Sequence, residues 1–198
     1  VPPSPKSFTT DFSEADLPAG LTFKNRHLET YQIADGKFVS QLNNSNLHTT
    51  ETYGDFEISM RAKASTGRIV IVFGETDTNT GYVGGKSVKD QVIGIMFCCD
   101  GGSNPAQMRF FDNNVSGTNF TSLHNTKKPK AEESNLINNF VDLTLTFANG
   151  KVSGTIDGEV IIDQIAVTTI PLPGHIMICG GAAETILTLD SFAITDLN

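Results

Sequence analysis

The sequence predicts an all-β domain of two stacked antiparallel sheets. Short runs of alternating apolar and polar residues recur along its 198 residues, with Gly, Asp and Asn between them. The clearest run is 55–63, whose apolar members are Phe56, Ile58, Met60 and Ala62 and whose polar members are Asp55, Glu57, Ser59, Arg61 and Lys63. Side chains of a strand alternate between two faces, so this run is a strand with a core face and a polar face. No segment has a convincing helical pattern, and about a dozen short strands at this spacing fit a sandwich.

The first half of the chain divides into extended runs. We expect extended segments at 7–12, 31–33, 37–42, 54–64 and 68–73, with a loop at 17–20. Asp35-Gly36 between two alternating runs is a strong hairpin signal. Residues 68–73 are almost wholly β-branched, which predicts a central strand that is buried on both faces.

The second half contains the most secure local prediction. We expect strands at 91–98, 107–112, 140–147, 151–156, 159–163, 175–179 and 186–195, and loops at 74–85 and 113–139. Asn149-Gly150 and Asp157-Gly158 separate three of these runs and predict a three-stranded meander. No repeat or linker divides the chain, so residues 1–198 are expected to form a single domain.

Composition narrows the possible partners. The net charge of −8 and a pI of about 4.9 disfavour nucleic acid, whose phosphates an acidic chain repels. No apolar run approaches the roughly 18 residues that a membrane helix needs, so no membrane span is expected. The sequence begins Val1-Pro2 without Met, which fits either a mature extracellular or secreted protein or a trimmed one.

The cysteines leave two readings open. Cys98 and Cys99 are adjacent and rarely bridge each other, so in an oxidising compartment one of them is expected to pair with Cys179. The other reading is three buried thiols. Sequons at Asn43, Asn114 and Asn119 permit glycosylation of a secreted eukaryotic protein.

The order of these elements resembles the concanavalin A-like lectin/glucanase superfamily. The resemblance covers nearly the whole chain and rests on Asp11-Phe12, Ala-Asp-Gly-Lys-Phe at 34–38, Thr-Tyr-Gly-Asp-Phe-Glu-Ile-Ser-Met-Arg-Ala-Lys at 52–63, the meander at 141–161 and Leu-Thr-Leu-Asp-Ser-Phe-Ala-Ile at 187–194. It implies a jelly roll of two curved sheets, with glycan on the concave sheet or on the loops at one end. The polar face of strand 54–64 then becomes a candidate cleft wall, with Glu57 and Arg61 as its central pair. The superfamily includes lectins, carbohydrate-binding modules, adhesion domains, glycoside hydrolases and polysaccharide lyases, so the fold does not choose among functions.

The hydrolases of this superfamily often carry Glu-x-Asp-x-Glu, which puts three carboxylates on one face of a strand. The nearest match here is Glu75-Thr76-Asp77-Thr78-Asn79, which lacks the third acid, as does the bulged form ending at Thr80. Glu57, Glu75 and Asp77 are therefore only weak catalytic candidates, and a solvated turn is the favoured reading of 75–80.

A lyase needs a base together with a cation or amide that neutralises a uronate. The candidate ligand-binding residues are Glu57, Arg61, Tyr82, Gln91, Gln107 and Arg109, and the histidines His48 and His175 are further possible parts. Gln107 and Arg109 share one face of their strand because they are two residues apart. The chain has no Trp, so a sugar platform falls to Tyr53, Tyr82, Phe111 or Phe120.

The resemblance implies one possible cofactor, a structural calcium ion. Jelly rolls of this superfamily often hold one where the first and last strands meet, and Asp11 and Asp190 occupy matching positions near the two ends of the chain.

The leading hypothesis is an extracellular lectin-like domain that binds an oligo- or polysaccharide on the concave sheet or its rim. A glycoside hydrolase or polysaccharide lyase is the alternative, and an adhesion domain is the third. A continuous groove lined by Glu57, Arg61, Gln91 and Arg109 favours an enzyme, whereas a shallow patch with an exposed aromatic residue favours a lectin.

Overall fold

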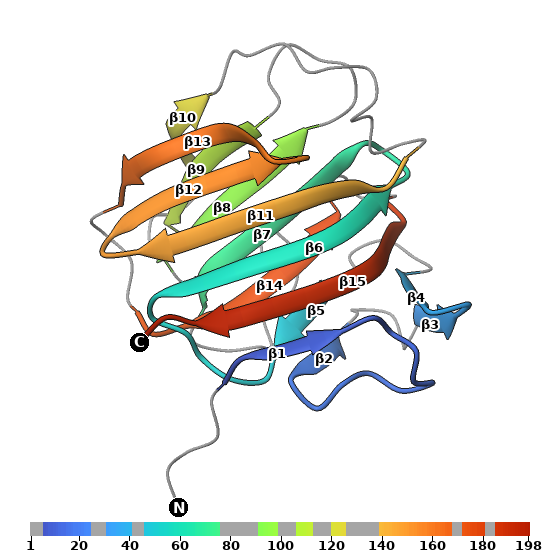
Figure 1. The fold of residues 1–198 in the computed structure, drawn as a ribbon. Coiled ribbons are helices and arrows are strands. Elements are labelled where there is room, and N and C mark those ends of the chain that lie inside the picture. The colour runs from blue at the N-terminus through green and yellow to red at the C-terminus, as the bar shows by residue number, and fades with distance from the viewer. Residues whose placement is uncertain are drawn as a thin grey trace, which may run out of the picture.

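The fold is a sandwich of two antiparallel sheets, as the sequence predicts (Figure 1). The computed structural model describes residues 6–24, 31–40, 46–75, 91–98, 106–112, 120–125, 139–167, 172–180 and 185–198. Every element in these ranges is a strand or a turn. Within them, no helix is long and apolar enough to cross a membrane.

The sheet that we call sheet A contains both ends of the described chain. Its strands are β1 (Phe8–Thr10), β3 (Tyr31–Ala34), β4 (Lys37–Ser40), β6 (Phe56–Ala64), β11 (Val141–Ala148), β12 (Lys151–Ile156), β13 (Glu159–Ala166) and β15 (Leu187–Asp196). Their order is β13-β12-β11-β6-β15-β4-β3, and β1 also pairs with β15. The predicted first and last strands therefore lie side by side.

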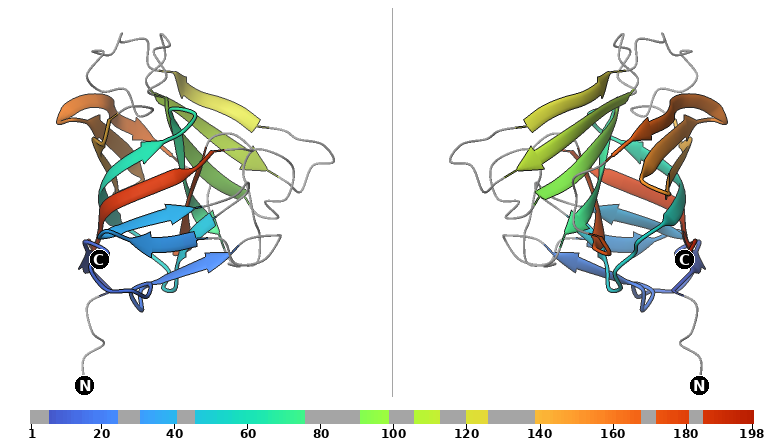
Figure 2. Two further views of the ribbon diagram at one scale, coloured as in Figure 1. Left: turned by 90° about the vertical axis from the view of Figure 1, so that its right-hand side faces the viewer. Right: turned by 90° about the vertical axis from the view of Figure 1, so that its left-hand side faces the viewer.

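Sheet B lies behind sheet A in Figure 1, and the two layers are seen edge-on in Figure 2. Its strands are β2 (Leu21–Lys24), β5 (Asn46–Thr49), β7 (Arg68–Glu75), β8 (Gln91–Cys98), β9 (Ala106–Asp112), β10 (Phe120–Asn125) and β14 (His175–Gly180). Their order is β10-β9-β8-β7-β14-β5-β2. Strand β7 is central, as its β-branched composition predicts.

The three predicted tight turns all form. Asp35-Gly36, Asn149-Gly150 and Asp157-Gly158 each have positive φ at both residues, between 49° and 77°. Two positive φ angles in succession are the signature of a type I′ turn, whose twist matches that of the flanking strands. These turns join β3 to β4, β11 to β12 and β12 to β13, so the predicted meander is confirmed.

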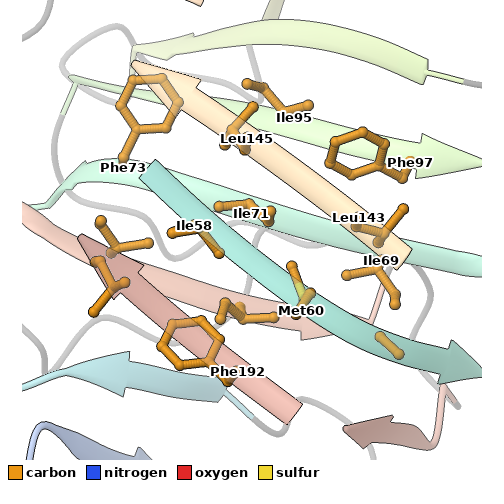
Figure 3. Close-up of a cluster of buried hydrophobic side chains, with 14 of the residues drawn as sticks. Ile58, Met60, Ile69, Ile71, Phe73, Ile95, Phe97, Leu143, Leu145 and Phe192 are labelled. Atoms are coloured by element: carbon orange, nitrogen blue, oxygen red, sulfur yellow. The ribbon is translucent and has the colours of Figure 1, made fainter. Parts of the chain in front are cut away.

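The core fills the space between the two sheets (Figure 3). Sheet A contributes Ile58, Met60, Leu143, Leu145 and Phe192, and sheet B contributes Ile69, Ile71, Phe73, Ile95 and Phe97. Each of these side chains comes from alternate positions of its strand, and each is 3% exposed or less. Burial of these apolar surfaces is the main favourable term that holds the two sheets together.

Three strands were not expected from the sequence. Phe120–Asn125 forms β10 inside the segment 113–139, which we expected to be a loop, and β2 and β5 had no predicted counterpart. All three are short, and β5 is buried at every position, so its sequence has no alternation to detect. Their partners in the sheet, rather than their own patterns, define them.

Tyr53 ties the start of the chain to the sandwich. Its side chain is 1% exposed, and its hydroxyl donates to the backbone oxygen of Lys6 at 2.8 Å. Its backbone forms a two-way bridge with Gly174. Burial, followed by the negative charges of Asp196 and Glu51, raises the pKa of Tyr53 to about 12.

Replacing Leu145 by Ala is expected to lower the free energy of unfolding by about 2–5 kcal/mol, because it leaves a cavity in the core between the sheets. Thr144→Ala, at the next position of the same strand but on its outer face, is the matched control, with an expected change within about 0.5 kcal/mol. Urea denaturation of both variants measures the difference. Equal losses would contradict the assignment of the two faces of β11.

Tyr53 is expected to titrate later than an ordinary tyrosine. Its folded pKa of about 12 exceeds its ordinary value of 10.0, so above pH 10 the unfolded chain loses this proton first. The contribution of Tyr53 to stability is therefore complete below pH 10 and is lost as the pH rises toward 12. Phenolate absorbance against pH measures the transition, which Tyr53→Phe should remove. A wild-type titration with every tyrosine near pH 10 would refute it.

Candidate functional site

Each sheet has an outer face that points away from the core between the sheets. On β6, Glu57, Ser59 and Arg61 are exposed on this face, while the alternate residues are buried. On β7, Val70 and Val72 point away from that core and yet remain buried, in a second apolar cluster. We call these surfaces the outer face of sheet A and the outer face of sheet B.

The outer face of sheet A carries a chain of opposite charges. Arg61 Nη1 lies 3.2 Å from both carboxylate oxygens of Asp142, and Arg61 Nε lies 3.7 Å from Asp190 Oδ2. Lys37 Nζ is 3.4 Å from the other oxygen of Asp190. Glu57 accepts a hydrogen bond from Thr146 at 3.1 Å. The charge of Arg61 is thus already matched by two carboxylates, which makes Arg61 a poor anchor for a ligand carboxylate.

The outer face of sheet B is organised in rows that cross all seven strands. Residues paired across neighbouring strands occupy the same face, so the register defines each row. One row is Thr22, His48, Met177, Val72, Gly94, Arg109 and Ser122. The next is Lys24, Asn46, Cys179, Val70, Met96, Gln107 and Asn125. Both rows are apolar in the middle and polar toward their ends.

Most of the described positions on this face are buried. Asn46 and His48 are 1% and 0% exposed, Val72 and Met177 are both 0% exposed, Gly94 is buried, and Met96 is half-buried. Both polar atoms of the Asn46 side chain are buried and have no hydrogen-bond partner among the described residues. Burial of an amide is costly unless it is hydrogen-bonded. The Asn-x-His spacing puts Asn46 and His48 on one face of β5, but no local pattern indicates that both are buried.

The four residues whose continuous groove would favour an enzyme lie on different sheets. Glu57 and Arg61 lie on sheet A, whereas Gln91 and Arg109 lie on β8 and β9 of sheet B. The outer-face positions Glu57 and Arg61 are separated from Arg109 by the whole core. Strand alternation assigns a face within a strand but does not say to which sheet the strand belongs.

The remaining candidates divide by position. Gln107 and Arg109 stand in the two rows of sheet B, confirming that they share a face. Gln91 has the parity of the buried core residue Ile93, so it does not fall in a row. Glu75 pairs with His175 after a register shift at the end of β7, which places it on the outer face of sheet B but outside the two rows. Tyr82 and Asp77 lie outside the described residues.

The two aspartates proposed for calcium do not fit that ion as they are arranged. Asp11 follows β1 directly, and hydrogen bonds from Ser13 lower its pKa below the ordinary value. Asp190 is held against two cations, Lys37 and Arg61, rather than presenting an open ligand. Within the described ranges, no three His, Cys, Asp or Glu side chains gather closely enough to hold a metal ion.

The register separates Cys98 from Cys179. Cys98 pairs with Arg68 on one side of β7, and Cys179 pairs with Val70 on its other side. Two strand spacings of about 4.8 Å each exceed the roughly 7 Å limit for the Cα atoms of a disulfide. These two cysteines therefore do not bridge, and Cys179 is a buried thiol.

The comparisons with known proteins agree on the fold. No family model matches the sequence, and no curated protein matches it. The structure resembles an endo-β-1,3-glucanase from Pyrococcus furiosus, with a TM-score of 0.65, 11% identity, and coverage of 96% of this chain and 93% of that one. It also resembles the exoplasmic/lumenal domain of VIP36 in its Ca²⁺/Man3GlcNAc-bound form, with a TM-score of 0.62, 12% identity, and 90% and 85% coverage.

A third similar structure is the carbohydrate-binding module CBM66 from Bacillus subtilis, with a TM-score of 0.53, 12% identity, and coverage of 89% of this chain and 92% of that one. Together these likenesses identify the fold as a concanavalin A-like jelly roll, as the sequence resemblance implies. At such low identities they establish the fold alone.

The ion pairs of Arg61 are expected to contribute little to stability, because the three side chains are 46%, 62% and 35% exposed. A double-mutant cycle of Arg61→Ala and Asp190→Ala should give a coupling free energy below about 1 kcal/mol. Urea unfolding at low and high salt measures it, and salt should shrink it further. A coupling above about 2 kcal/mol that salt leaves unchanged would show that this cluster is a structural anchor.

Proposed function

We propose that this chain is an extracellular, lectin-like domain that binds an oligo- or polysaccharide on the outer face of sheet B without cleaving it. One observation carries the proposal. In the two rows that cross sheet B, no position in the described strands is Asp or Glu. The extracellular location has weaker support, from the exoplasmic/lumenal domain of the similar VIP36 structure.

Hydrolysis of a glycosidic bond normally requires two carboxyl groups, roughly 5–9.5 Å apart, that flank the bond. On the outer face of β8, the alternating positions are Val92, Gly94 and Met96, none of which is an acid. No Glu-x-Asp-x-Glu triplet occurs anywhere in the sequence. The two rows therefore offer no pair of acids for hydrolysis, which supports binding over cleavage.

The β9–β10 side of the face suits a sugar ring. Phe111 and Phe120 are direct cross-strand partners, and Phe111 also pairs with Val92 of β8. These two aromatic positions adjoin Arg109 and Ser122, which pair with each other two residues along the same strands. Sugar recognition combines flat apolar surface with a few polar groups, and this juxtaposition supplies both without Trp.

A lyase is the runner-up, because His48 and Arg109 stand in the same row. Four strand spacings separate them, or about 19 Å, which is too far for a base and a neutralising cation to act on one sugar unit. The similar structures include a glucanase, the Man3GlcNAc-bound domain of VIP36 and a carbohydrate-binding module, and the last two support the binding function.

The test is binding and product formation measured on one panel of plant, algal and fungal polysaccharides. We expect retarded migration in affinity gels with at least one polysaccharide, and neither new reducing ends nor unsaturated products. Phe111→Ala should weaken binding about 10-fold, the loss of about 1.4 kcal/mol that stacking on an aromatic ring can supply. Phe140→Ala is the matched control, because Phe140 stands beside Arg61 and Lys63 of sheet A.

Product that accumulates in proportion to protein would replace this proposal with an enzyme. Absence of binding across the panel would leave the adhesion domain. Circular dichroism and thermal unfolding confirm that each variant is folded, and Ser122→Ala provides a smaller change on the same face if Phe111→Ala is unstable. Equal losses for Phe111→Ala and Phe140→Ala would refute the assignment to sheet B.

A further inference from the structure

Strand β13 lies at one end of sheet A (Figure 1). It pairs with β12 on one side, and among the described strands none pairs with its other side. The edge of a sheet presents backbone N–H and C=O groups to which a strand of another molecule can bond. An apolar, β-branched segment at such an edge is prone to pair with a copy of itself. The apolar residues of β13 are Val160, Ile161, Ile162, Ile165 and Ala166.

The pairing of β13 with β12 is interrupted twice. Val160 pairs with Thr155, but the next paired residue is Ile162, opposite Gly154, so Ile161 is extra. One extra residue in a strand is a β-bulge, which bends the strand and disrupts the local ladder of hydrogen bonds. The outer backbone groups of β13 therefore lose their regular spacing at this point.

The second interruption is held by hydrogen bonds to a side chain. Between Ile162 and Ile165, the two residues Asp163 and Gln164 stand opposite Ser153 alone. Gln164 has a φ of 49°, in the left-handed region that residues other than Gly seldom adopt. Its backbone N–H and its side-chain Nε2 both donate to Ser153 Oγ, at 3.2 and 3.0 Å. Ser153 thus stabilises a conformation of Gln164 that the backbone alone disfavours.

Burial along β13 follows the bulges rather than strict alternation. Ile161 and Ile162 are consecutive and yet only 5% and 0% exposed, whereas Asp163 and Gln164 are consecutive and both exposed. In a regular strand, consecutive side chains point to opposite faces. The bulged strand therefore exposes two polar residues in succession, one of them charged, in the middle of an apolar edge.

We propose that this second bulge, which Gln164 closes on Ser153, prevents β13 from pairing with β13 of a second copy of the chain. Pairing of two edges needs several regularly spaced N–H and C=O groups in succession. The two bulges within the eight residues of β13 interrupt that run. Without Gln164, Asp163 would stand opposite Ser153, and the pairing would be regular from Ile162 to Ala166.

The test compares deletion of Gln164 with Gln164→Gly. Deletion removes the extra residue and leaves the pairs on both sides of it unchanged. Gly removes the same side chain but keeps the extra residue and adopts positive φ readily. Light scattering after size exclusion measures the mass over a range of protein concentrations, and hydrogen exchange measures the amides of 159–166.

We expect the mass of the deletion variant to rise with protein concentration and exchange of the 159–166 amides to slow at least about 10-fold as it does. The wild type and Gln164→Gly should show neither change. A folded deletion variant that matches Gln164→Gly in both measurements would overturn the proposal. Concentration-dependent protection of 159–166 in the wild type would overturn it as well.

Circular dichroism and thermal unfolding establish that each variant is folded. If the deletion prevents folding, Ser153→Ala combined with Gln164→Val removes the hydrogen-bond acceptor and introduces a β-branched side chain that disfavours positive φ. Ser59→Ala combined with Thr144→Val is the matched control, because these cross-strand partners lie on the interior strands β6 and β11. We expect only the first double variant to associate, and equal association, or none in either, would overturn the proposal.

Discussion

The rest of the structure depends on the burial of β7 on both faces. Ile69, Ile71 and Phe73 pack into the core between the sheets, while Val70 and Val72 pack into the second apolar cluster with Met177 and Cys179. A strand buried on both sides cannot carry charge at its central positions without a large desolvation cost. The centre of sheet B is therefore apolar on its outer face, and the polar positions of the two rows lie on β5 on one side and on β9 on the other.

The two outer faces then have different roles. Sheet A places its polar side in water, where Arg61, Asp142 and Asp190 neutralise one another and contribute little free energy. That arrangement leaves few unmatched charges among the described side chains of this face. The outer face of sheet B is instead buried over much of its two rows, at Asn46, His48, Val72, Met177 and Cys179.

Local sequence patterns predicted local structure well. The Asx-Gly pairs, the alternation of β6 and β11, and the double burial of β7 each depend on residues a few positions apart, and all appear in the structure. The positions of the candidate-site residues could not be predicted in this way, because they depend on pairing between strands that are far apart in the sequence. Nothing local to Arg61 reveals that its strand lies next to β11 and β15, and nothing local to Arg109 reveals that it faces Gly94. The short β5, buried throughout, had no pattern by which Asn46 and His48 could be predicted to lie on the same face as Arg109.

The buried amide of Asn46 lowers the stability of the outer face of sheet B. An apolar residue of similar size at this position would extend the cluster formed by Val70 and Cys179 and would avoid the desolvation of a polar group, typically about 1–3 kcal/mol. Asn46 is a direct neighbour of Cys179 in its row, so its polarity interrupts a surface that packing alone would make continuous. A polar group retained at a cost to stability is expected where it serves recognition rather than folding. In this row the cost falls at Asn46, where the apolar cluster of Val70, Val72, Met177 and Cys179 ends.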